Sequence, residues 1–520
     1  MGSDIEAKFS SNVSIKPTGD MGDVQRPVDT KNDDVAAAFL QRIAQRDDGE
    51  ELLKPDMPKE VRSIIRKADA IIITLLQFSL MMGSVDKVSI GSAAVLGMRA
   101  DTHLKGQEYS WTSAIIYFGA IVSIIPSLAL MQRLPANLYI STNVCIWGVI
   151  TMGMASSRNF ADLMGIRFVL GCFESVIFAG FGLIISMWYT REEQPLRTAI
   201  VFSTLSSVMN GILATACVNY HGPLAQWRLL FIIVGAITFT ASLFLFWLLP
   251  ANPTSAWWLT IRQRVVATRR MADSHTGVEN KHFKWTQAWE AIYDPKTWLI
   301  FLINLALNIP NGGLITFNSI IVNSLGFTLE QTTLLGIPTG VFSWISSLVF
   351  GYIAVKTRQR CLSAMGSCIL PFVGTILLYK IPRTDIGGSL AALYLVYFYW
   401  GPYIVMMGSV YANTGGYTKK MIVYAIAYVG YSVGNIIGPQ TFRSEQAPKY
   451  TGGVIAMLTC YGVALVLIFV YRLYLVYLNK KKAKELAQYR AEQGTSTDDA
   501  LVDEFRDQTD FENPRFVYEL

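Results

Sequence analysis

The chain consists largely of apolar stretches of about 20 residues, the length at which an α-helix crosses the hydrocarbon core of a bilayer. A segment in lipid must satisfy its own backbone hydrogen bonds, so each stretch is expected to be helical. Only 16% of the 520 residues are charged, against about 25% in soluble domains. We therefore predict an all-α membrane protein with twelve transmembrane helices in two six-helix bundles. The predicted spans are 68–94, 110–133, 138–156, 160–188, 197–219, 227–249, 296–324, 331–355, 361–380, 386–412, 418–441 and 452–478.

A polar interruption divides the predicted spans into six and six. Lys and Arg near the span ends are several-fold more frequent on the side of the termini and of this interruption. The positive-inside rule then puts both termini and the central loop in the cytoplasm. The predicted parts are a tail at 1–67, a first bundle at 68–249, a loop at 250–295, a second bundle at 296–478 and a tail at 479–520.

The composition argues against several classes of function. The six cysteines form no CxxC pair, the four histidines lie outside the predicted spans, and no Gly-rich phosphate loop is present. We expect no enzyme, metal site, cofactor or direct ATP drive. The net charge of +6 is explained by basic loops, so no nucleic-acid partner is expected. Membrane lipid is the expected surrounding, and the protein is expected to be monomeric.

Two charged residues, Arg167 and Glu174, lie inside the fourth apolar stretch. Seven residues are two helical turns, so both side chains share one face. A charge at membrane depth survives when it faces a bundle interior or a wet cavity. We predict that Arg167 binds an anionic substrate and that Glu174 takes a proton when the anion draws Arg167 away. The alternative is a permanent Arg167–Glu174 ion pair that only fixes helix packing.

A second charged pair, Asp86-Lys87, lies in the first apolar stretch. It either reaches the extracellular interface by extending along the helix or lines the same cavity as Arg167 and Glu174. In the second case Lys87 joins the substrate-binding residues.

Neutral polar residues at similar depth could complete the site, although each could equally be a hydrogen bond between helices. Those assigned to substrate binding are Tyr117, Asn210, Asn308, Asn311 and Asn435. The run Asn308 to Gly313 is expected to interrupt its helix, because proline removes one backbone bond and glycine loosens the next turn. Three glycines spaced by four residues, Gly430 to Gly438, predict a closely packed helix face.

Two segments outside the spans leave alternatives open. Residues 257–270 read as an amphipathic helix that lies either in the lipid headgroups or in solvent as a linker. Residues 510–520 are rich in aromatic and acidic residues. They are either a partner-binding or sorting tag, or an unstructured tail.

Several motifs carry a family resemblance: Asp86-Lys87, Arg167-Phe-Val-Leu-Gly-Cys-Phe-Glu174, Trp188 to Arg197, Asn308 to Gly313 and Gly434 to Arg443. With them the transmembrane region resembles the fungal allantoate permease-like group in the anion:cation symporter family of the major facilitator superfamily. The resemblance implies two six-helix bundles, alternating access and proton-driven uptake of an organic anion at the plasma membrane. It also implies that Asp86 and Glu174 couple protons. Where the wider family often has arginine, this chain has Lys87, which keeps the charge and loses the planar fork.

The predicted function is therefore import of a small organic anion with protons, the anion being allantoate, ureidosuccinate or a peptide- or vitamin-like carboxylate. The alternative is export of a fungal metabolite or toxin from a biosynthetic pathway. A non-transporting nutrient sensor is a third class, disfavoured by the short tails.

Overall fold

The computed structural model describes residues 39, 42–43, 45–46, 52, 57–190, 193–202, 205–273, 284–493, 509–513 and 515–520. The chain divides into two compact units, Met1–Leu53 and Lys54–Leu520. All helices described below belong to the second unit, and the described residues of that unit contain no β-strand.

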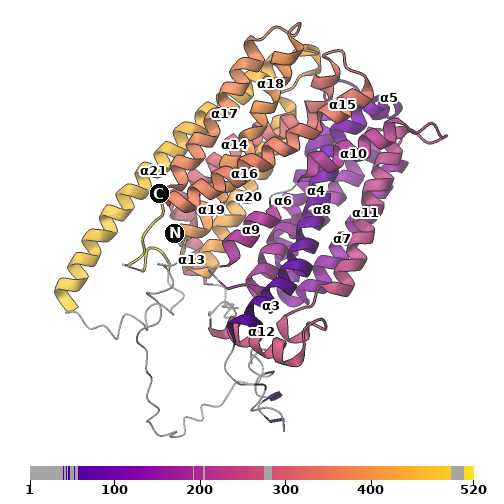
Figure 1. The fold of residues 1–520 in the computed structure, drawn as a ribbon. Coiled ribbons are helices and arrows are strands. Elements are labelled where there is room, and N and C mark those ends of the chain that lie inside the picture. Colours follow the sequence, from indigo (N-terminus) through magenta and orange to yellow (C-terminus); the bar gives the residue numbers. More distant parts are fainter. Residues whose placement is uncertain are drawn as a thin grey trace. The chain divides into compact units, whose positions relative to one another are not determined.

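The first half of the second unit forms six membrane-spanning helical segments (Figure 1). The first segment includes two π-helical stretches, Asp69–Ile73 and Ala94–Met98, and it kinks in the second, where Gly97 has a positive φ of 103°. The helices of this half are α3 (Pro58–Ala68), α4 (Thr74–Ala93), α5 (Arg99–Asp101), α6 (Glu108–Arg133), α7 (Ala136–Gly153), α8 (Phe160–Trp188), α9 (Gln194–Phe202), α10 (Ser206–Val218) and α11 (Gln226–Leu248).

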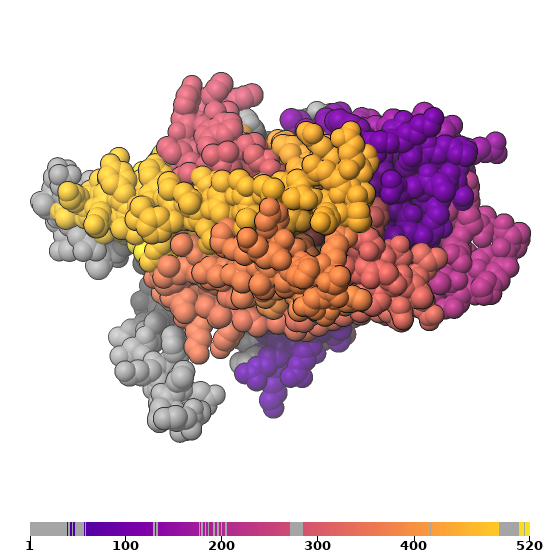
Figure 2. All heavy atoms as spheres, turned by 90° about the horizontal axis from the view of Figure 1, so that it is seen from above, coloured from indigo at the N-terminus to yellow at the C-terminus, as the bar shows by residue number. Residues whose placement is uncertain are grey.

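Two short helices, α12 (Ile261–Asp273) and α13 (Trp285–Tyr293), connect the halves. The second half again forms six spanning segments, and in a view from above the two halves occupy separate regions (Figure 2). Its helices are α14 (Pro295–Asn323), α15 (Leu329–Leu335), α16 (Ile337–Thr357), α17 (Arg360–Lys380), α18 (Ile386–Val396), α19 (Trp400–Ala412), α20 (Tyr417–Gln440) and α21 (Thr451–Gln493).

The described residues contain 12 helices that are long and apolar enough to cross a membrane, which confirms the predicted number and class. We call the end of the bundles that carries α12 and α13 the tail end, and the opposite end, which carries α5 and α15, the far end (Figure 1). Local sequence explains several boundaries. Asp294 accepts the Lys296 amide at the start of α14, and Arg358 ends α16 in a left-handed conformation (φ 54°).

The structure differs from the sequence expectation at both ends of the membrane region. The first helix of the membrane region begins at Pro58, ten residues before the predicted first span, and α21 continues to Gln493, beyond the predicted end at 478. Both extensions are polar helical turns that hydropathy alone does not mark. The extension of α21 has a structural role, because its residues Asn479 and Lys482 contact the 509–520 segment.

The expected interruption of α14 is wrong, because the helix runs unbroken through Pro310. The glycines that follow serve close packing instead. A Cβ atom on Gly312 would lie 2.8 Å from the Asn435 carbonyl oxygen, and one on Gly313 would lie 2.3 Å from the Phe442 ring. Tight contact with neighbours thus holds the turn in helical form although proline removes one bond.

The predicted glycine face of α20 packs against α14. A Cβ atom on Gly434 would lie 2.9 Å from the Asn308 Cβ, and one on Gly438 would lie 2.3 Å from the Ile309 carbonyl oxygen. Both distances are too short for a real side chain. The two helices therefore form one closely packed pair, with small residues where the backbones approach.

The connecting helix α12 packs part of its apolar side against protein. Val265 and Val266 are buried, Arg262 pairs with Glu60 of α3, and Arg270 pairs with Glu193. Placing these valines in the lipid headgroups is therefore wrong. Trp257 and Ile261 are exposed, and their placement in headgroups or solvent stays a prediction. Trp257 and Trp258 precede the helix, and Trp258 stacks on Trp188 at the end of α8 with ring centroids 5.3 Å apart.

Candidate functional site

A buried ion pair joins two helices of the first bundle. The Lys87 ammonium group of α4 contacts Oε1 of Glu174 on α8, and the two side chains are 10% and 6% exposed. Arg167 was expected to be the cation that pairs with Glu174, whereas Lys87 is the cation that contacts it. Spacing along one helix shows which residues share a face, but it does not show which neighbouring helix presents a nearer charge.

Arg167 and Asp86 are each 1% exposed. The Arg167 Nε and Nη1 atoms and both carboxylate oxygens of Asp86 have no well-aligned hydrogen-bond partner among the described residues. Asp86 lies within electrostatic range of Arg167, Glu174 and Lys87. Burial of Asp86 and Lys87 rules out the alternative in which this pair extends to the extracellular interface. The four predicted charged residues therefore form one buried cluster with no formal net charge.

A cavity of about 90 Å³ lies between the two bundles, and residues of both line it. The first bundle contributes Lys87, Ser84 and Asn210, and the second contributes Asn311 and Tyr431. Lys87 is the one charged side chain among the lining residues that the structure describes, whereas Arg167, Glu174 and Asp86 are not among them. The cationic partner of the buried pair is thus the group that a guest in the cavity would meet.

The predicted asparagines of the second bundle form one hydrogen-bonded group. Asn311 donates to Oδ1 of Asn435 at 2.9 Å and to Oδ1 of Asn308 at 3.3 Å, and it accepts from the Tyr399 hydroxyl at 2.5 Å. Asn308 also donates to the Asn304 carbonyl oxygen. Of the three asparagines Asn311 lines the cavity, and the other two stand behind it.

The two remaining predicted residues also lie where the bundles meet. Asn210 lines the cavity, donates to the Ser92 hydroxyl and accepts from the Ser89 hydroxyl of α4. Tyr117 packs edge-on against Tyr431, with ring centroids 5.9 Å apart. Asn210 is thus satisfied within its own bundle, and Tyr117 provides an aromatic contact across the bundle interface.

The cavity has an aromatic wall that was not predicted from the sequence. Tyr397, Tyr399 and Trp400 line it at the 3₁₀ turn between α18 and α19. The run Tyr397-Phe-Tyr-Trp400 in the tenth apolar stretch was a usable signal. Trp and Tyr bury well when their polar atoms find partners, and the helix break next to them marks an irregular turn inside the membrane region.

Hydrogen bonds between the bundles lie in their far halves. The Ser113 hydroxyl of α6 contacts the Thr316 hydroxyl of α14 at 2.6 Å, and the Tyr109 hydroxyl donates to the Thr316 carbonyl oxygen at 2.6 Å. The Thr215 hydroxyl of α10 contacts that of Thr333 on α15 at 2.8 Å. These contacts close the far end over the cavity.

Comparison with known families decides the class of protein. Residues 72–439 match the model of the Major Facilitator Superfamily. The chain belongs to this superfamily. It is therefore a membrane transporter of small molecules and not an enzyme.

Relatives extend along almost the whole chain. The "MFS-type transporter cnsL" of Penicillium expansum is 37% identical over 489 residues, covering 94% of this chain and 93% of that protein. The "Allantoate permease" of Saccharomyces cerevisiae is 32% identical over 479 residues, covering 89% and 87%. The "Thiamine pathway transporter THI73" of the same yeast is 29% identical over 502 residues, covering 93% of each chain.

The fold has a similar solved structure, a bacterial homologue of the human lysosomal transporter Spinster, described as inward-facing and unoccupied. The TM-score is 0.57 at 14% identity, with 80% of this chain and 98% of that chain covered. This likeness concerns the fold alone and confirms the two-bundle architecture of the transporter.

Proposed function

We propose that this transporter imports a small organic anion together with a proton, with Lys87 as the anion-binding cation and Glu174 as the proton acceptor. The observation that carries the proposal is the Lys87–Glu174 ion pair, buried next to a cavity that Lys87 itself lines. Arg167, given the substrate role in the sequence analysis, here serves the buried cluster around Asp86.

Electrostatic interactions couple the binding of the anion to the binding of the proton. While the cavity is empty, the Lys87 ammonium group stabilises the Glu174 carboxylate. A carboxylate that enters the cavity and pairs with Lys87 competes with Glu174 for the same cation. Glu174 is then a buried carboxylate with a weaker partner, and its neutral form becomes favourable. Anion and proton therefore promote each other's binding, which is the thermodynamic basis of symport.

The lining of the cavity indicates the class of guest. One cation among amide and hydroxyl groups, with Tyr399 and Trp400 on one side, fits a compact carboxylate that has hydrogen-bonding groups of its own. Sites for drug-sized ligands measure about 300–1,000 Å³, and about 90 Å³ is smaller. The guest is therefore small, or the walls separate as it enters. Allantoate belongs to this chemical class, and an allantoate permease is among the relatives.

The test is uptake of a labelled panel in yeast cells that lack their own permeases, at two external pH values. The panel contains allantoate, ureidosuccinate, a dipeptide, nicotinate and pantothenate. We expect one or more carboxylates to accumulate faster at the lower pH, and Lys87→Met to stop this. Accumulation of an anion that is insensitive to pH would overturn proton coupling, and unchanged uptake by Lys87→Met would overturn the anion site.

Direction and cellular location complete the proposal. We place the transporter in the plasma membrane with both termini in the cytoplasm, in line with the excess of basic residues on that side. Export would use the same cavity, so cells loaded with the labelled anion test it directly. Faster efflux than uptake under an inward proton gradient would favour the exporter. An epitope tag at residue 2, accessible to antibody only after permeabilisation, tests the topology.

A further inference from the structure

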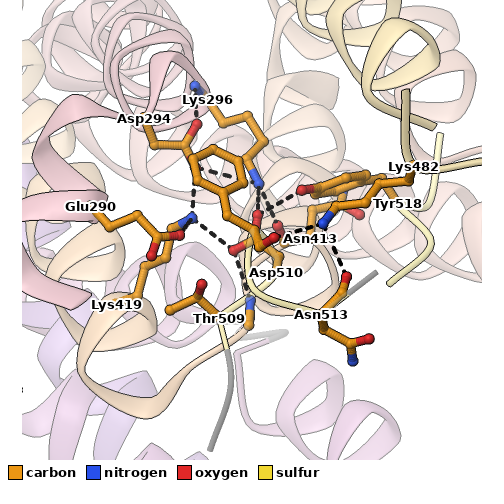
Figure 3. Close-up of polar contacts among 12 residues, drawn as sticks. Glu290, Asp294, Lys296, Asn413, Lys419, Lys482, Thr509, Asp510, Asn513 and Tyr518 are labelled. Carbon is orange, nitrogen blue, oxygen red and sulfur yellow. Dashed lines mark hydrogen bonds and ion pairs between the residues drawn. The ribbon is translucent and has the colours of Figure 1, made fainter. Parts of the chain in front are cut away.

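Residues 509–520 are bound to the tail end of the second bundle (Figure 3). Asp510 is fully buried, and its carboxylate contacts the ammonium groups of Lys296 on α14 and Lys419 on α20. The Tyr518 hydroxyl donates to Oδ2 of Asp510 at 2.8 Å. The alternative of an unstructured tail is therefore wrong for this segment.

The helices provide a site with matched polar groups along the whole segment. Asn413 donates to the Glu519 carbonyl oxygen at 2.9 Å and accepts from the Glu519 amide at 2.7 Å. Asn479 of α21 makes the same two-way contact with Tyr518, at 2.9 Å in both directions. Lys482 of α21 donates to the carbonyl oxygens of Phe511 and Asn513 at 2.7 and 3.0 Å. Side chains of the bundle thus form hydrogen bonds with backbone groups of the segment.

The segment forms a turn of its own at this site. Thr509 and Glu512 cap each other's amides at 2.9 and 3.1 Å and form a turn that presents Asp510. The Phe511 ring lies over the Lys419 ammonium group, 3.8 Å from ring centroid to Nζ. Gly415 faces the turn so closely that a Cβ there would lie 2.5 Å from the Asp510 nitrogen. Charge and shape are both complementary.

Asp510 adds a third carboxylate contact to two buried lysines of the bundle. Lys419 is 0% exposed and Lys296 is 4% exposed, and both share the carboxylate of Asp294, at 3.0 and 3.4 Å. Glu290 of α13 adds a contact to Lys419 at 2.8 Å. Removing Asp510 would leave Asp294 and Glu290 to balance the two ammonium groups. Lys296 would then keep a single carboxylate contact, to Asp294 at 3.4 Å, which is unfavourable for a buried charge.

We propose that the tail end of the second bundle is a recognition site for the 509–520 segment, and that the docked segment is a permanent clamp that makes α14, α20 and α21 move as one body. The described polar contacts of the segment all lie within the second bundle. Rocking of one bundle against the other therefore does not require the segment to leave.

The clamp acts at the start of the helices that wall the cavity. Asn311 of α14 lies about 22 Å along the helix from Lys296, and Tyr431 of α20 lies about 18 Å from Lys419, at ~1.5 Å per residue. The close glycine contacts between α14 and α20 extend this restraint along both helices toward the cavity. The proposal rests on the transporter fold and does not depend on the identity of the substrate.

The decisive experiment cuts the segment free after folding. A protease recognition sequence is inserted within residues 494–508, the full chain is purified in detergent, and the protein is cleaved and passed over a sizing column. We expect the segment to stay with the bundle, and to be lost at least about tenfold faster in Asp510→Asn, which removes one of the charges. Val517→Ala is the matched control, because Val517 is 74% exposed, and it should retain the segment like the unmodified chain. Equal loss from Asp510→Asn and Val517→Ala would overturn the recognition site.

A second measurement tests the clamp separately. After the cut segment is removed by dilution and a second sizing column, hydrogen exchange is followed in the first turns of α14 and α20. We expect it to rise at least about tenfold there and to be unchanged in α4 and α8. A peptide of residues 509–520 should restore protection. In the intact chain a disulfide between Asn413→Cys and Glu519→Cys should leave transport of the labelled panel unchanged. Protection unaffected by loss of the segment, or transport stopped by the disulfide, would overturn the permanent clamp.

Discussion

The ammonium group of Lys87 on α4 contacts the carboxylate of Glu174 on α8 next to the cavity between the bundles. The two residues lie 87 positions apart in the sequence, and one of them faces the space that a guest would occupy. A guest of the same charge as Glu174 therefore acts on the pair directly, whereas a neutral guest does not.

The first prediction concerns Glu174→Gln, which keeps the shape of the side chain and removes its charge. The variant should lose accumulation driven by a pH gradient and keep counterflow exchange of the anion, because Lys87 still binds the guest but no proton is bound with it. Labelled counterflow in proteoliposomes, with and without the gradient, measures both. Glu330→Gln is the matched control, since Glu330 is an exposed carboxylate at the start of α15. Gradient-driven accumulation by Glu174→Gln would assign the proton to another group.

The second prediction concerns the buried cluster behind the cavity. Arg167→Met leaves Asp86 buried with one nearby cation fewer, and a buried charge with less compensation is unfavourable. We expect a clear drop in the melting temperature. Adding Asp86→Asn should recover part of it, because the remaining charge is removed as well. A thiol-reactive dye is a suitable probe, since Cys217, Cys361 and Cys368 are buried. If Arg167→Met and the unmodified chain had the same melting temperature, the proposed structural role of Arg167 would be contradicted.

The third prediction concerns the packing of α14 and α20. Gly438→Ala should destabilise the protein, because its Cβ would lie 2.3 Å from the Ile309 carbonyl oxygen, and backbone on both sides would have to separate. Gly351→Ala is the control within a helix, since no heavy atom lies within 4 Å of its added Cβ. Alanine also favours helix over glycine by about 1 kcal/mol, so this control should be neutral or slightly stabilising. Equal melting temperatures for the two variants would contradict close packing at Gly438.

The architecture could be predicted from the sequence because lipid forces each apolar stretch to satisfy its own backbone bonds. The membership of the charged cluster was predicted too, since charges at membrane depth are rare and costly. The pairing within the cluster was not predicted. Lys87 and Glu174 lie on two different helices, and residue spacing gives information on one helix at a time. The cavity wall at Tyr397 to Trp400 was missed although its aromatic run is visible in the sequence.

Two further errors have identifiable physical causes. Pro310 and the two glycines after it predict a broken helix by composition. The contacts of Gly312 with α20 and of Gly313 with Phe442 keep this turn helical. Residues 510–520 resemble a solvated tail by composition. The two buried lysines that bind them come from positions about 200 and 90 residues earlier in the chain, and no local pattern reports such distant partners.

The fourth prediction concerns the pH dependence of the clamp. Burial alone would raise the pKa of the Asp510 carboxyl, but Lys296 and Lys419 outweigh it and hold the pKa below its ordinary value of 3.8. A carboxyl with a lowered pKa in the docked state stabilises docking fully above its free pKa. That contribution is lost as the pH falls through the docked value. Tyr518 donates to the Asp510 carboxylate, and Asp294 and Glu290 contact the two lysines that face it. Retention of the cut segment should therefore be constant from pH 8 to pH 5 and fall below about pH 4.

The Asp510→Asn segment should bind weakly at every pH, and its binding should change less with pH. Fluorescence anisotropy of a labelled 509–520 peptide measures both. Loss of retention between pH 5 and pH 7 in the unmodified chain would show that a group other than Asp510 controls the clamp.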